Sequence, residues 1–209
     1  MGSLGTVQRL IALDMEGVVT PEIWEAVATH TGVSELLRTT RDEPNYQKLM
    51  EYRLALLDKH KIKLSVIKNV ISDLDLLPGA RSFLDELRER YQVVILSDTF
   101  EEFASHFSEL LGYPHLLCHK LRVDDDRITG FLLRINDPKA RAVEAYQSLN
   151  YHVSAAGDSH NDVTMLKTAD VGCLFRAADG LINGHPDLSS MATYEDLLKW
   201  ITDLDEESF

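Results

Sequence analysis

Two carboxylates one residue apart, Asp14 and Glu16, directly follow the apolar residues 10–13 and precede Gly17. A carboxylate next to a buried strand is unfavourable unless a cation or hydrogen-bond donors accompany it. In open α/β sheets ligands bind beyond the carboxyl ends of the strands, which is where both carboxylates would lie. For this segment alone a solvated turn is the simpler interpretation, so the chemistry depends on what other segments contribute.

Polar side chains of the types used in phosphoryl transfer stand at three later positions: Ser97 with Asp98, Lys139, and Asp158 with Asn161 and Asp162. If the strands are parallel, the groups at the strand ends emerge at one edge of the sheet. Together they offer a carboxylate nucleophile, a hydroxyl and an ammonium for phosphate oxygens, and acidic ligands for Mg²⁺. Because Mg²⁺ prefers few carboxylates together with water and phosphate oxygens, Asp14 and Asp158 suit it.

The rest of the chain predicts the elements that position these groups. Apolar runs of strand length cover residues 10–13, 93–96, 152–156 and 172–175, and helical periodicity of apolar side chains separates them. Alternating strands and helices predict an α/β fold with a doubly wound, Rossmann-like parallel sheet.

Between the first two strands every periodic signal is helical. A favourable helix start opens this section, with Thr20 as the expected N-cap, Pro21 at the first helical position and Glu22 in the first turn, and Pro78-Gly79 closes the section. The pattern therefore predicts a small helical insert, residues 21–77, placed after the first strand of a core domain formed by residues 9–20 and 78–209.

Four local patterns give further expectations. Residues 97–99 read as a turn that ends the second strand and caps the next helix. Apolar runs on both sides of the polar residues 124–127 predict a β-hairpin or flap. Residues 1–8 read as a polar leader, and residues 203–209 as a charged tail after a closing helix.

Composition excludes several classes of protein. The 209 residues carry a net charge of −13, which disfavours binding to nucleic acid or to an anionic membrane surface. There is neither an apolar run long enough to span a membrane nor a secretory leader, so a cytoplasmic protein is expected. The two cysteines, Cys118 and Cys173, lack metal-ligand spacing and are expected to be buried and unpaired.

These motifs resemble those of the haloacid dehalogenase superfamily of phosphotransferases, and the quoted residues are the following: Asp14-Met15-Glu16-Gly17, Leu96-Ser97-Asp98, Lys139, and Gly157-Asp158-Ser159-His160-Asn161-Asp162. Within the superfamily the chain is similar to phosphoserine phosphatases, and more so to bifunctional members that also transfer the phosphoryl group to homoserine. The segments that carry that closer likeness are Asp14-Met15-Glu16-Gly17-Val18, Pro21-Glu22-Ile23-Trp24, Thr39-Thr40-Arg41-Asp42, Leu96-Ser97-Asp98-Thr99-Phe100, Leu117-Cys118-His119-Lys120-Leu121 and Ala155-Ala156-Gly157-Asp158-Ser159.

The resemblance implies a haloacid dehalogenase core with a small helical cap, and a Mg²⁺-dependent phosphatase acting on phosphoserine in serine and threonine biosynthesis. Asp14 would be the nucleophile that becomes an aspartyl phosphate. Glu16 would be the acid/base, with its backbone carbonyl on the metal. Asp158 would ligate Mg²⁺, and Asp162 would support the same metal site. A small phosphoester and homoserine would be the partners, and a homodimer is among the expected assemblies although the sequence does not determine the oligomeric state.

The resemblance also assigns residues to the substrate. Those expected to bind its phosphate are Ser97, Lys139, Gly17 and Asp98, the last two through their backbone amides. Asn161 would touch the substrate, Glu22 would face its ammonium group, and Arg53 would bind its carboxylate, for which the planar guanidinium is suited.

Two positions depart from the family pattern. Most members carry Asp where this chain has Glu16, and a carboxylate displaced by about 1 Å can change a rate by about 10²-fold. We expect Glu16 to slow attack by water and so to leave time for transfer to homoserine. Phosphoserine phosphatases usually have Gly where this chain has Asp98, whose side chain must therefore turn away from the phosphate.

Three alternatives remain open from the sequence. The protein could be a plain phosphoserine phosphatase, or a phosphatase for another small phosphoester, because specificity depends on a few cap side chains. A non-enzymatic receiver-type signalling module also places Asp, Ser/Thr and Lys at strand ends, but it needs neither the helical insert nor the motif of residues 157–162.

Overall fold

The computed structural model describes residues 8–206, and within them the chain forms one seven-stranded sheet with the order β4-β3-β2-β1-β5-β6-β7. The strands are β1 Gln8–Leu13, β2 Gln92–Phe100, β3 His115–Asp124, β4 Arg127–Leu132, β5 Tyr151–Gly157, β6 Val171–Phe175 and β7 Ser189–Met191. All neighbouring strands are parallel except β3 and β4. The leader expected over residues 1–8 lies outside the described residues except for Gln8, which begins β1.

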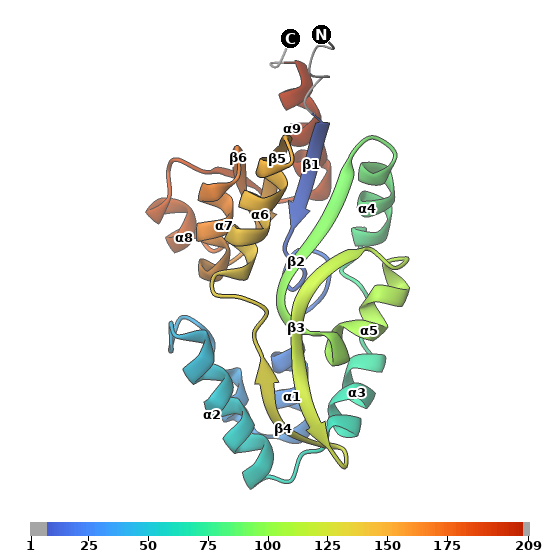
Figure 1. Cartoon of the computed structure of the whole chain (residues 1–209), viewed down its shortest axis with the longest axis vertical. Helices are drawn as coiled ribbons and strands as arrows, with labels where there is room; N and C mark the ends of the chain where they lie inside the picture. Colours follow the sequence, from blue (N-terminus) through green and yellow to red (C-terminus); the bar gives the residue numbers. More distant parts are fainter. Residues whose placement is uncertain (1–7, 207–209) are drawn as a thin grey trace.

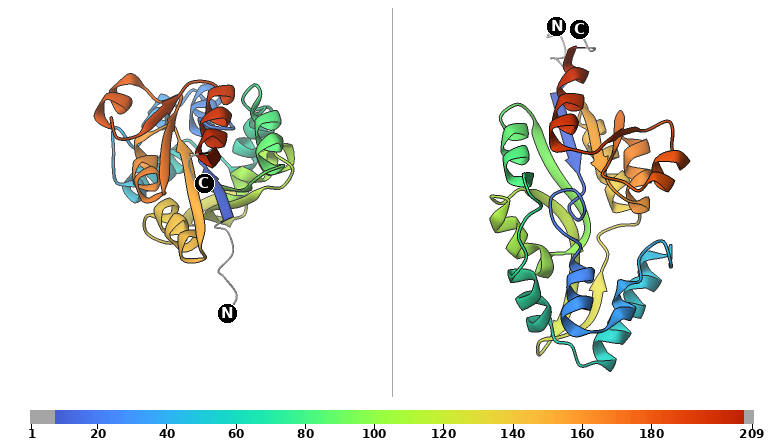
Figure 2. Two further views of the ribbon diagram at one scale, coloured as in Figure 1. Left: turned by 90° about the horizontal axis from the view of Figure 1, so that it is seen from above. Right: turned by 180° about the vertical axis from the view of Figure 1, so that it is seen from behind.

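Helices cover both faces of the sheet (Figures 1 and 2). They are α1 Ile23–Thr31, α2 Tyr46–Lys59, α3 Leu64–Ser72, α4 Ala80–Arg88, α5 Glu101–Leu110, α6 Pro138–Ser148, α7 Val163–Thr168, α8 Asp179–Gly184 and α9 Tyr194–Glu206, with short 3₁₀ helices η1 Ser34–Leu37 and η2 His160–Asp162. Helices α4, α5 and α9 pack on one face, and α6, α7 and α8 on the other.

Side chains of β1 alternate between the two layers. Ile11 and Leu13 belong to the core shared with α4 and α5, whereas Leu10 and Ala12 belong to the core shared with α6 and α7. Successive side chains of a strand point to opposite faces, so a strand buried on both faces is apolar throughout. The predicted doubly wound α/β sheet is therefore confirmed.

Residues between β1 and α4 contain helices and loops, as the sequence predicts. Helices α1 to α3 form one end of the molecule, beyond the carboxyl end of β1, together with the β3–β4 hairpin (Figure 1). The tip of the hairpin holds this end, because Asp126 accepts hydrogen bonds from Ser65 at the start of α3. Arg127 also pairs with Asp58 of α2 at 2.6 Å.

The hairpin was predicted correctly, but it is not a separate flap, since residues 115–117 of β3 pair with β2 in the main sheet. The expected turn at residues 97–99 is wrong. β2 continues through them to Phe100, and its register against β3 shifts between Leu96 and Phe100. The predicted charged tail is also wrong in part, because α9 runs to Glu206, and the Leu204 carbonyl accepts a hydrogen bond from Arg9 at 2.8 Å.

Two further observations bear on the sequence analysis. Cys118 and Cys173 are both buried and unpaired, as predicted, and burial raises the pKa of these thiols to about 11 and about 12. Over residues 8–206, no helix combines the length and the apolar character needed to cross a bilayer.

Candidate active site

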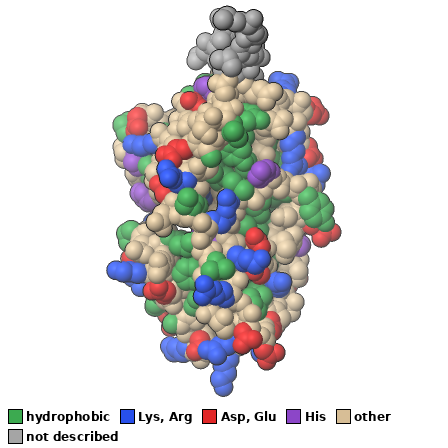
Figure 3. All heavy atoms as spheres, viewed as in Figure 1, with side chains coloured by type: hydrophobic (Ala, Val, Ile, Leu, Met, Phe, Trp, Pro, Cys, Tyr) green, Lys and Arg blue, Asp and Glu red, His purple; other side chains and the backbone are tan. Residues whose placement is uncertain are grey.

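A cleft of about 500 Å³ lies between the carboxyl ends of the central strands and the helices α1 and α2. Nine of the eleven residues singled out from the sequence line it: Asp14, Glu16, Glu22, Arg53, Ser97, Asp98, Lys139, Asp158 and Asn161. The other two, Gly17 and Asp162, lie behind Asp158 and contact it or the loop that carries it. Figure 3 shows the molecule hollowed at mid-height, between the end that carries α2 and the core above it.

Lys139 connects the acidic groups of the site. Its Nζ atom lies 2.7 Å from Oδ1 of Asp14, 2.6 Å from Oδ1 of Asp162 and 3.7 Å from Oδ2 of Asp98. Pro138 begins α6 and places Lys139 in its first turn, so that the side chain reaches into the buried space under β1. Burial by itself would lower the pKa of Lys139, but the Asp14 and Asp162 charges raise it well above its usual range. The ammonium is therefore permanent and counters part of the acidic charge.

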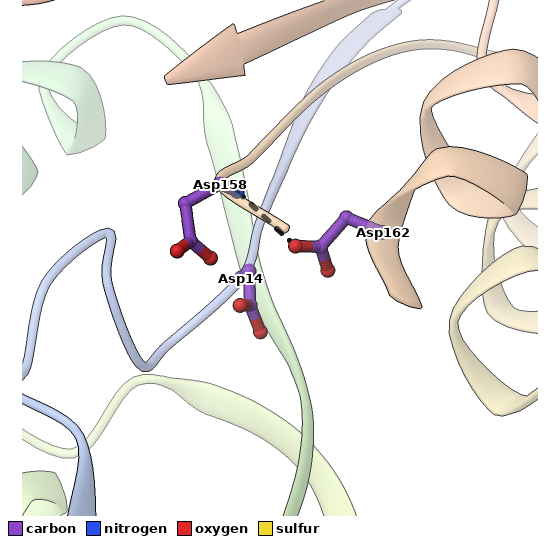
Figure 4. A group of neighbouring side chains, drawn as sticks. All are labelled: Asp14, Asp158 and Asp162. Atoms are coloured by element: carbon purple, nitrogen blue, oxygen red, sulfur yellow. Dashed lines mark hydrogen bonds between the residues drawn. The ribbon is translucent and has the colours of Figure 1, made fainter. Parts of the chain in front are cut away.

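Asp14 also belongs to a cluster of three carboxylates. One oxygen each of Asp14, Asp158 and Asp162 lies within 4.8 Å of the others (Figure 4). Oδ1 of Asp158 is buried and has no hydrogen-bond partner among the described residues. Burial, and then the charge of Asp162, raises the pKa of Asp158 to about 7. A divalent cation at this position would satisfy the orphaned oxygen and the excess negative charge, so the residues present fit a metal.

Asp162 differs from the other two because both of its oxygens are already occupied. Oδ2 accepts backbone N–H groups of Asp158 and Ser159 at 3.1 Å each, and Oδ1 accepts the Lys139 ammonium. Its side chain thereby shapes the loop that presents Asp158 (Figure 4). Because both oxygens already accept hydrogen bonds, Asp162 holds the cluster in place and is not itself suited to ligate an ion.

Residue 17 must be Gly because the loop that carries Asp158 passes close to its backbone. Its backbone has φ +79°, in the left-handed region, and a Cβ atom there would lie 2.5 Å from Cγ of Asp158. Any side chain at residue 17 would displace Asp158 from the carboxylate cluster.

Glu16 has a role in the fold that the sequence did not reveal. Its Oε2 atom accepts the backbone N–H of Ile23 at 2.9 Å and so caps the first turn of α1. The predicted cap, Thr20, is wrong: α1 begins at Ile23, and the buried Thr20 hydroxyl donates to the Met15 carbonyl instead. Burial, and then the neighbouring Glu22 carboxylate, raises the pKa of Glu16 to about 8, and burial also raises the pKa of Glu22.

Ser97 and Asp98 lie within β2 at the floor of the cleft. Ser97 is buried, and its Oγ atom accepts the N–H of Thr99 at 3.2 Å. The Asp98 side chain turns toward Asn161, whose Nδ2 atom donates to it at 3.0 Å. Although burial opposes it, the Lys139 charge and a hydrogen bond from His119 lower the pKa of Asp98 to about 2. Asp98 is therefore ionised and turned toward protein donors.

Arg53 enters the cleft from α2 and is buried, which rules out an exposed position on the outer face of that helix. Its guanidinium lies over the ring of Trp24, 4.6 Å from the centroid, and Nη2 donates to the Arg38 carbonyl at 2.8 Å. Its Nε atom is buried without a partner among the described residues. Arg53 therefore lines the cleft while one of its N–H donors stays unused by the described part of the chain.

Several residues of the site were not identified from the sequence, namely Trp24, Thr39, Thr40, Arg41, Tyr46 and Ser159 in the cleft lining, and His119 behind Asp98. Tyr46 could have been found, because it lies seven residues before Arg53 and so on the same face of a helix. His119 offers no such signal, since its contact with Asp98 depends on the pairing of β2 with β3.

Comparisons with known proteins point to one family. The family model of the haloacid dehalogenase-like hydrolases matches residues 26–167. The phosphoserine phosphatase ThrH of Pseudomonas aeruginosa is 53% identical over 190 residues, covering 90% of this chain and 93% of that protein. A phosphoserine phosphatase of Pseudomonas syringae pv. tomato is 51% identical over 192 residues, covering 91% of this chain and 81% of that protein.

Solved structures share the fold. A phospho-aspartyl intermediate analogue of a phosphoserine phosphatase superposes with a TM-score of 0.78 at 22% identity, covering 93% of this chain and 99% of the other. A substrate-bound phosphoserine phosphatase complex gives a TM-score of 0.78 at 21% identity, covering 94% and 99%. The matching family model and the two relatives that are more than half identical lead to one conclusion: this chain belongs to the haloacid dehalogenase-like hydrolase family.

Proposed function

We propose that the protein is a Mg²⁺-dependent phosphatase and phosphotransferase that takes the phosphoryl group of phosphoserine onto Asp14 and passes it to water or to homoserine. The observation that carries this proposal is the buried pair of Asp14 and Lys139 beside the orphaned oxygen of Asp158, in a cleft whose other end holds Arg53 and Glu22. The names of the two Pseudomonas relatives support phosphoserine as the substrate.

In the first step, an oxygen of Asp14 forms a bond to phosphorus while the bond between phosphorus and the serine oxygen breaks. Lys139 holds Oδ1 of Asp14 at 2.7 Å, which leaves Oδ2 to attack. Glu16 supplies a proton to the leaving serine alkoxide, for which its raised pKa of about 8 is suited. Ser97 and Lys139 hold the phosphate oxygens, and the backbone amide of Asp98 adds a donor. The Gly17 amide, also expected there, instead donates to the Thr20 carbonyl at 2.8 Å.

In the second step, Glu16 takes the proton of water or of the homoserine hydroxyl as that oxygen attacks the aspartyl phosphate. The bond between phosphorus and Asp14 breaks, and the carboxylate is regenerated. Mg²⁺, when bound, would neutralise charge on the phosphate and on Asp14. Asp14, Asp158 and the backbone carbonyl of Glu16 would hold it, with Asp162 in support.

The amino-acid part of the substrate would lie toward α1 and α2. Arg53 binds its carboxylate through the free Nε side of the guanidinium, and Glu22 faces its ammonium group. In this proposal residues 21–77 act as the cap over a core of residues 9–20 and 78–209. Asn161 contacts the substrate from the opposite wall, where Asp98 holds its amide.

The test is incubation of the protein with phosphoserine and Mg²⁺, with and without homoserine, while serine, phosphate and phosphohomoserine are measured together. Release of serine with many turnovers supports the phosphatase, and formation of phosphohomoserine supports the transferase. Phosphorylation that stops at one equivalent per chain would instead indicate a receiver-type module. Formation of phosphate without phosphohomoserine would indicate a plain phosphatase and contradict the transferase part of the proposal.

The proposal further includes a cytoplasmic location and small molecules as partners, with neither nucleic acid nor a membrane among them. The net charge of −13 supports this, because a phosphate backbone would be repelled. The homodimer stays a prediction, which light scattering of the purified protein at several concentrations would check.

Metal removal is expected to change both activity and the pH dependence of stability. Without metal, the raised pKa of Asp158, about 7, means that the folded state keeps a proton that the unfolded state loses near pH 4. The free energy of unfolding should therefore fall as pH rises from about 4 to about 7. Mg²⁺ should remove this contribution and restore the activity lost in EDTA, as urea unfolding and phosphate release in each condition would measure.

Asp158→Asn is the control for that experiment, because it removes the titrating group without changing the size of the side chain. The variant should show a smaller decrease of stability with pH in EDTA and little stabilisation by Mg²⁺. Equal pH dependence of the two proteins in EDTA would contradict the raised pKa of Asp158, and equal stabilisation of the two by Mg²⁺ would contradict its assignment to the metal site.

Glu16→Asp is expected to shift the partition of the phosphoryl group toward water, by up to about 10²-fold. The Glu16 carboxylate reaches the N–H of Ile23 at 2.9 Å, and a side chain one methylene shorter would not span that distance. The shorter carboxylate would be freed from the helix and could activate water. The measurement is the ratio of phosphate to phosphohomoserine at a fixed homoserine concentration.

Glu16→Gln serves as the matched control, since the amide oxygen still accepts the N–H of Ile23 but cannot transfer a proton. Both products should fall together in that variant. A ratio in Glu16→Asp equal to that of the parent protein would remove the idea that the length of Glu16 sets the balance.

A further inference from the structure

Helix α2 contributes two polar side chains to the cleft, Tyr46 at its first position and Arg53 seven residues later, together with the apolar Leu49. Seven residues are about two helical turns, so the two side chains lie on one face with about 10 Å between their positions along the axis. Any contact that holds Tyr46 against the core therefore also determines where Arg53 stands.

Tyr46 makes such a contact. Its hydroxyl donates a short hydrogen bond to the backbone carbonyl of Asp98, the residue directly after Ser97. Burial, and then the Asp98 carboxylate, raises the pKa of Tyr46 well above its usual range, so the hydroxyl remains a donor. The Tyr46 ring also packs on the buried His119 ring, with 5.7 Å between centroids.

The acceptor of this hydrogen bond is itself fixed. The Asp98 side chain accepts from Asn161 at 3.0 Å, and Nε2 of His119 lies 3.6 Å from its other oxygen. Nδ1 of His119 accepts the N–H of Arg134 at 3.3 Å, so in the neutral ring the proton is on Nε2, which faces Asp98. Asn161 and His119 thus contact the two oxygens of the Asp98 carboxylate, which fixes the residue whose carbonyl accepts the Tyr46 hydrogen bond.

The same residues separate two cavities. A second cavity of about 390 Å³ lies beside the cleft, between the start of α2 and residues 133–138. Four residues line both cavities: Tyr46, Asp98, Lys139 and Asn161. If Tyr46 left Asp98, this partition would open beside the phosphate-binding residues.

We propose that the hydrogen bond from Tyr46 to the Asp98 carbonyl is a latch that sets the distance between Arg53 and the phosphate site at Ser97, and so selects phosphoesters of the length of phosphoserine. Tyr46 acts here as a positioning residue, through Arg53 on one side and Asp98 on the other. The inference rests on the proposed function, because it takes Arg53 as the carboxylate site and Ser97 as part of the phosphate site.

The test is Tyr46→Phe, which keeps the ring on His119 and removes only the hydroxyl. Loss of one hydrogen bond should raise KM for phosphoserine roughly 3- to 10-fold with little change in kcat. p-Nitrophenyl phosphate has no carboxylate for Arg53, so its kcat/KM should stay the same. Phosphohomoserine, one methylene longer, should be hydrolysed better relative to phosphoserine than by the parent protein.

Tyr52→Phe is the matched control, because it makes the same substitution on the same helix. The Tyr52 ring stacks with Arg38 and does not line the cleft. It should leave every one of these values unchanged. In an Arg53→Lys background, Tyr46→Phe should have no further effect on phosphoserine, because the two residues act on one contact.

An equal loss for phosphoserine and p-nitrophenyl phosphate, or no change for either, would overturn the latch. Failure of the parent protein to hydrolyse phosphoserine would instead overturn the proposed function. A failure of the inference thus shows in the Tyr46→Phe variant, whereas a failure of the proposed function shows in the parent protein.

Discussion

Asp14→Asn protein is expected to lose turnover of phosphoserine by roughly 10⁴-fold or more, the scale found when a catalytic nucleophile is removed. The amide cannot form the acyl phosphate, and it also removes one of the charges that a metal would need. The loss should be equal for p-nitrophenyl phosphate, because it concerns the chemical step and not recognition of the amino acid. Phosphate release in a coupled assay would measure both substrates.

The fold should survive this substitution, which keeps the test specific. Burial, and then the Asp162 charge, raises the pKa of Asp14 well above its usual range, so a neutral amide at this position relieves part of an unfavourable concentration of negative charge. Lys139 retains Asp162 at 2.6 Å when Asp14 is replaced. We therefore expect no decrease in Tm. Asp124→Asn, at an exposed position of the hairpin, is the control for activity, and an Asp14→Asn protein as active as its parent would refute the whole mechanism.

Arg53→Lys is expected to lower kcat/KM for phosphoserine by roughly 10²- to 10³-fold, mainly through KM. Two charge-assisted hydrogen bonds from a planar guanidinium to a carboxylate contribute about 1.5–3 kcal/mol each, and an ammonium cannot reproduce the pair. The stacking on Trp24 at 4.6 Å also holds the guanidinium in place, and a lysine would lose that orientation.

Substrate choice separates this effect from damage to the cap. p-Nitrophenyl phosphate, which lacks a carboxylate, should be turned over by Arg53→Lys within a few-fold of the parent rate. A parallel loss for both substrates would show that Arg53 supports the fold of α2 and does not bind substrate.

The two results together would locate the reaction at one end of the cleft and recognition at the other. The core supplies Asp14, Ser97, Lys139 and Asp158, whereas the residue before α1, Glu22, and Arg53 of α2 come from the helical end. Glu16 belongs to both, since its carboxylate lies in the cleft while capping α1. A change in the position of α1 would therefore also move the Glu16 carboxylate relative to Asp14.

The sequence by itself was sufficient to predict the architecture and to single out nine residues that the structure places in the lining of one cleft. Apolar runs such as residues 10–13 predict buried parallel strands because both faces of the sheet are covered. Parallel strands bring their carboxyl ends to one edge, so polar residues after separate strands must meet there. That rule alone placed Asp14, Ser97 and Asp158 in one cleft, although 144 residues separate the first from the last.

Only the tertiary structure decided the contacts that cross between elements. Glu16 caps a helix in place of Thr20, and β2 runs on through residues 97–99 where a turn was expected. His119 and Tyr46 reach Asp98 from β3 and α2. Local patterns report which face of an element is apolar, whereas such contacts depend on register and on the distance between packed elements. A shift of the register by one residue leaves the apolar pattern nearly unchanged but gives a side chain a different contact partner.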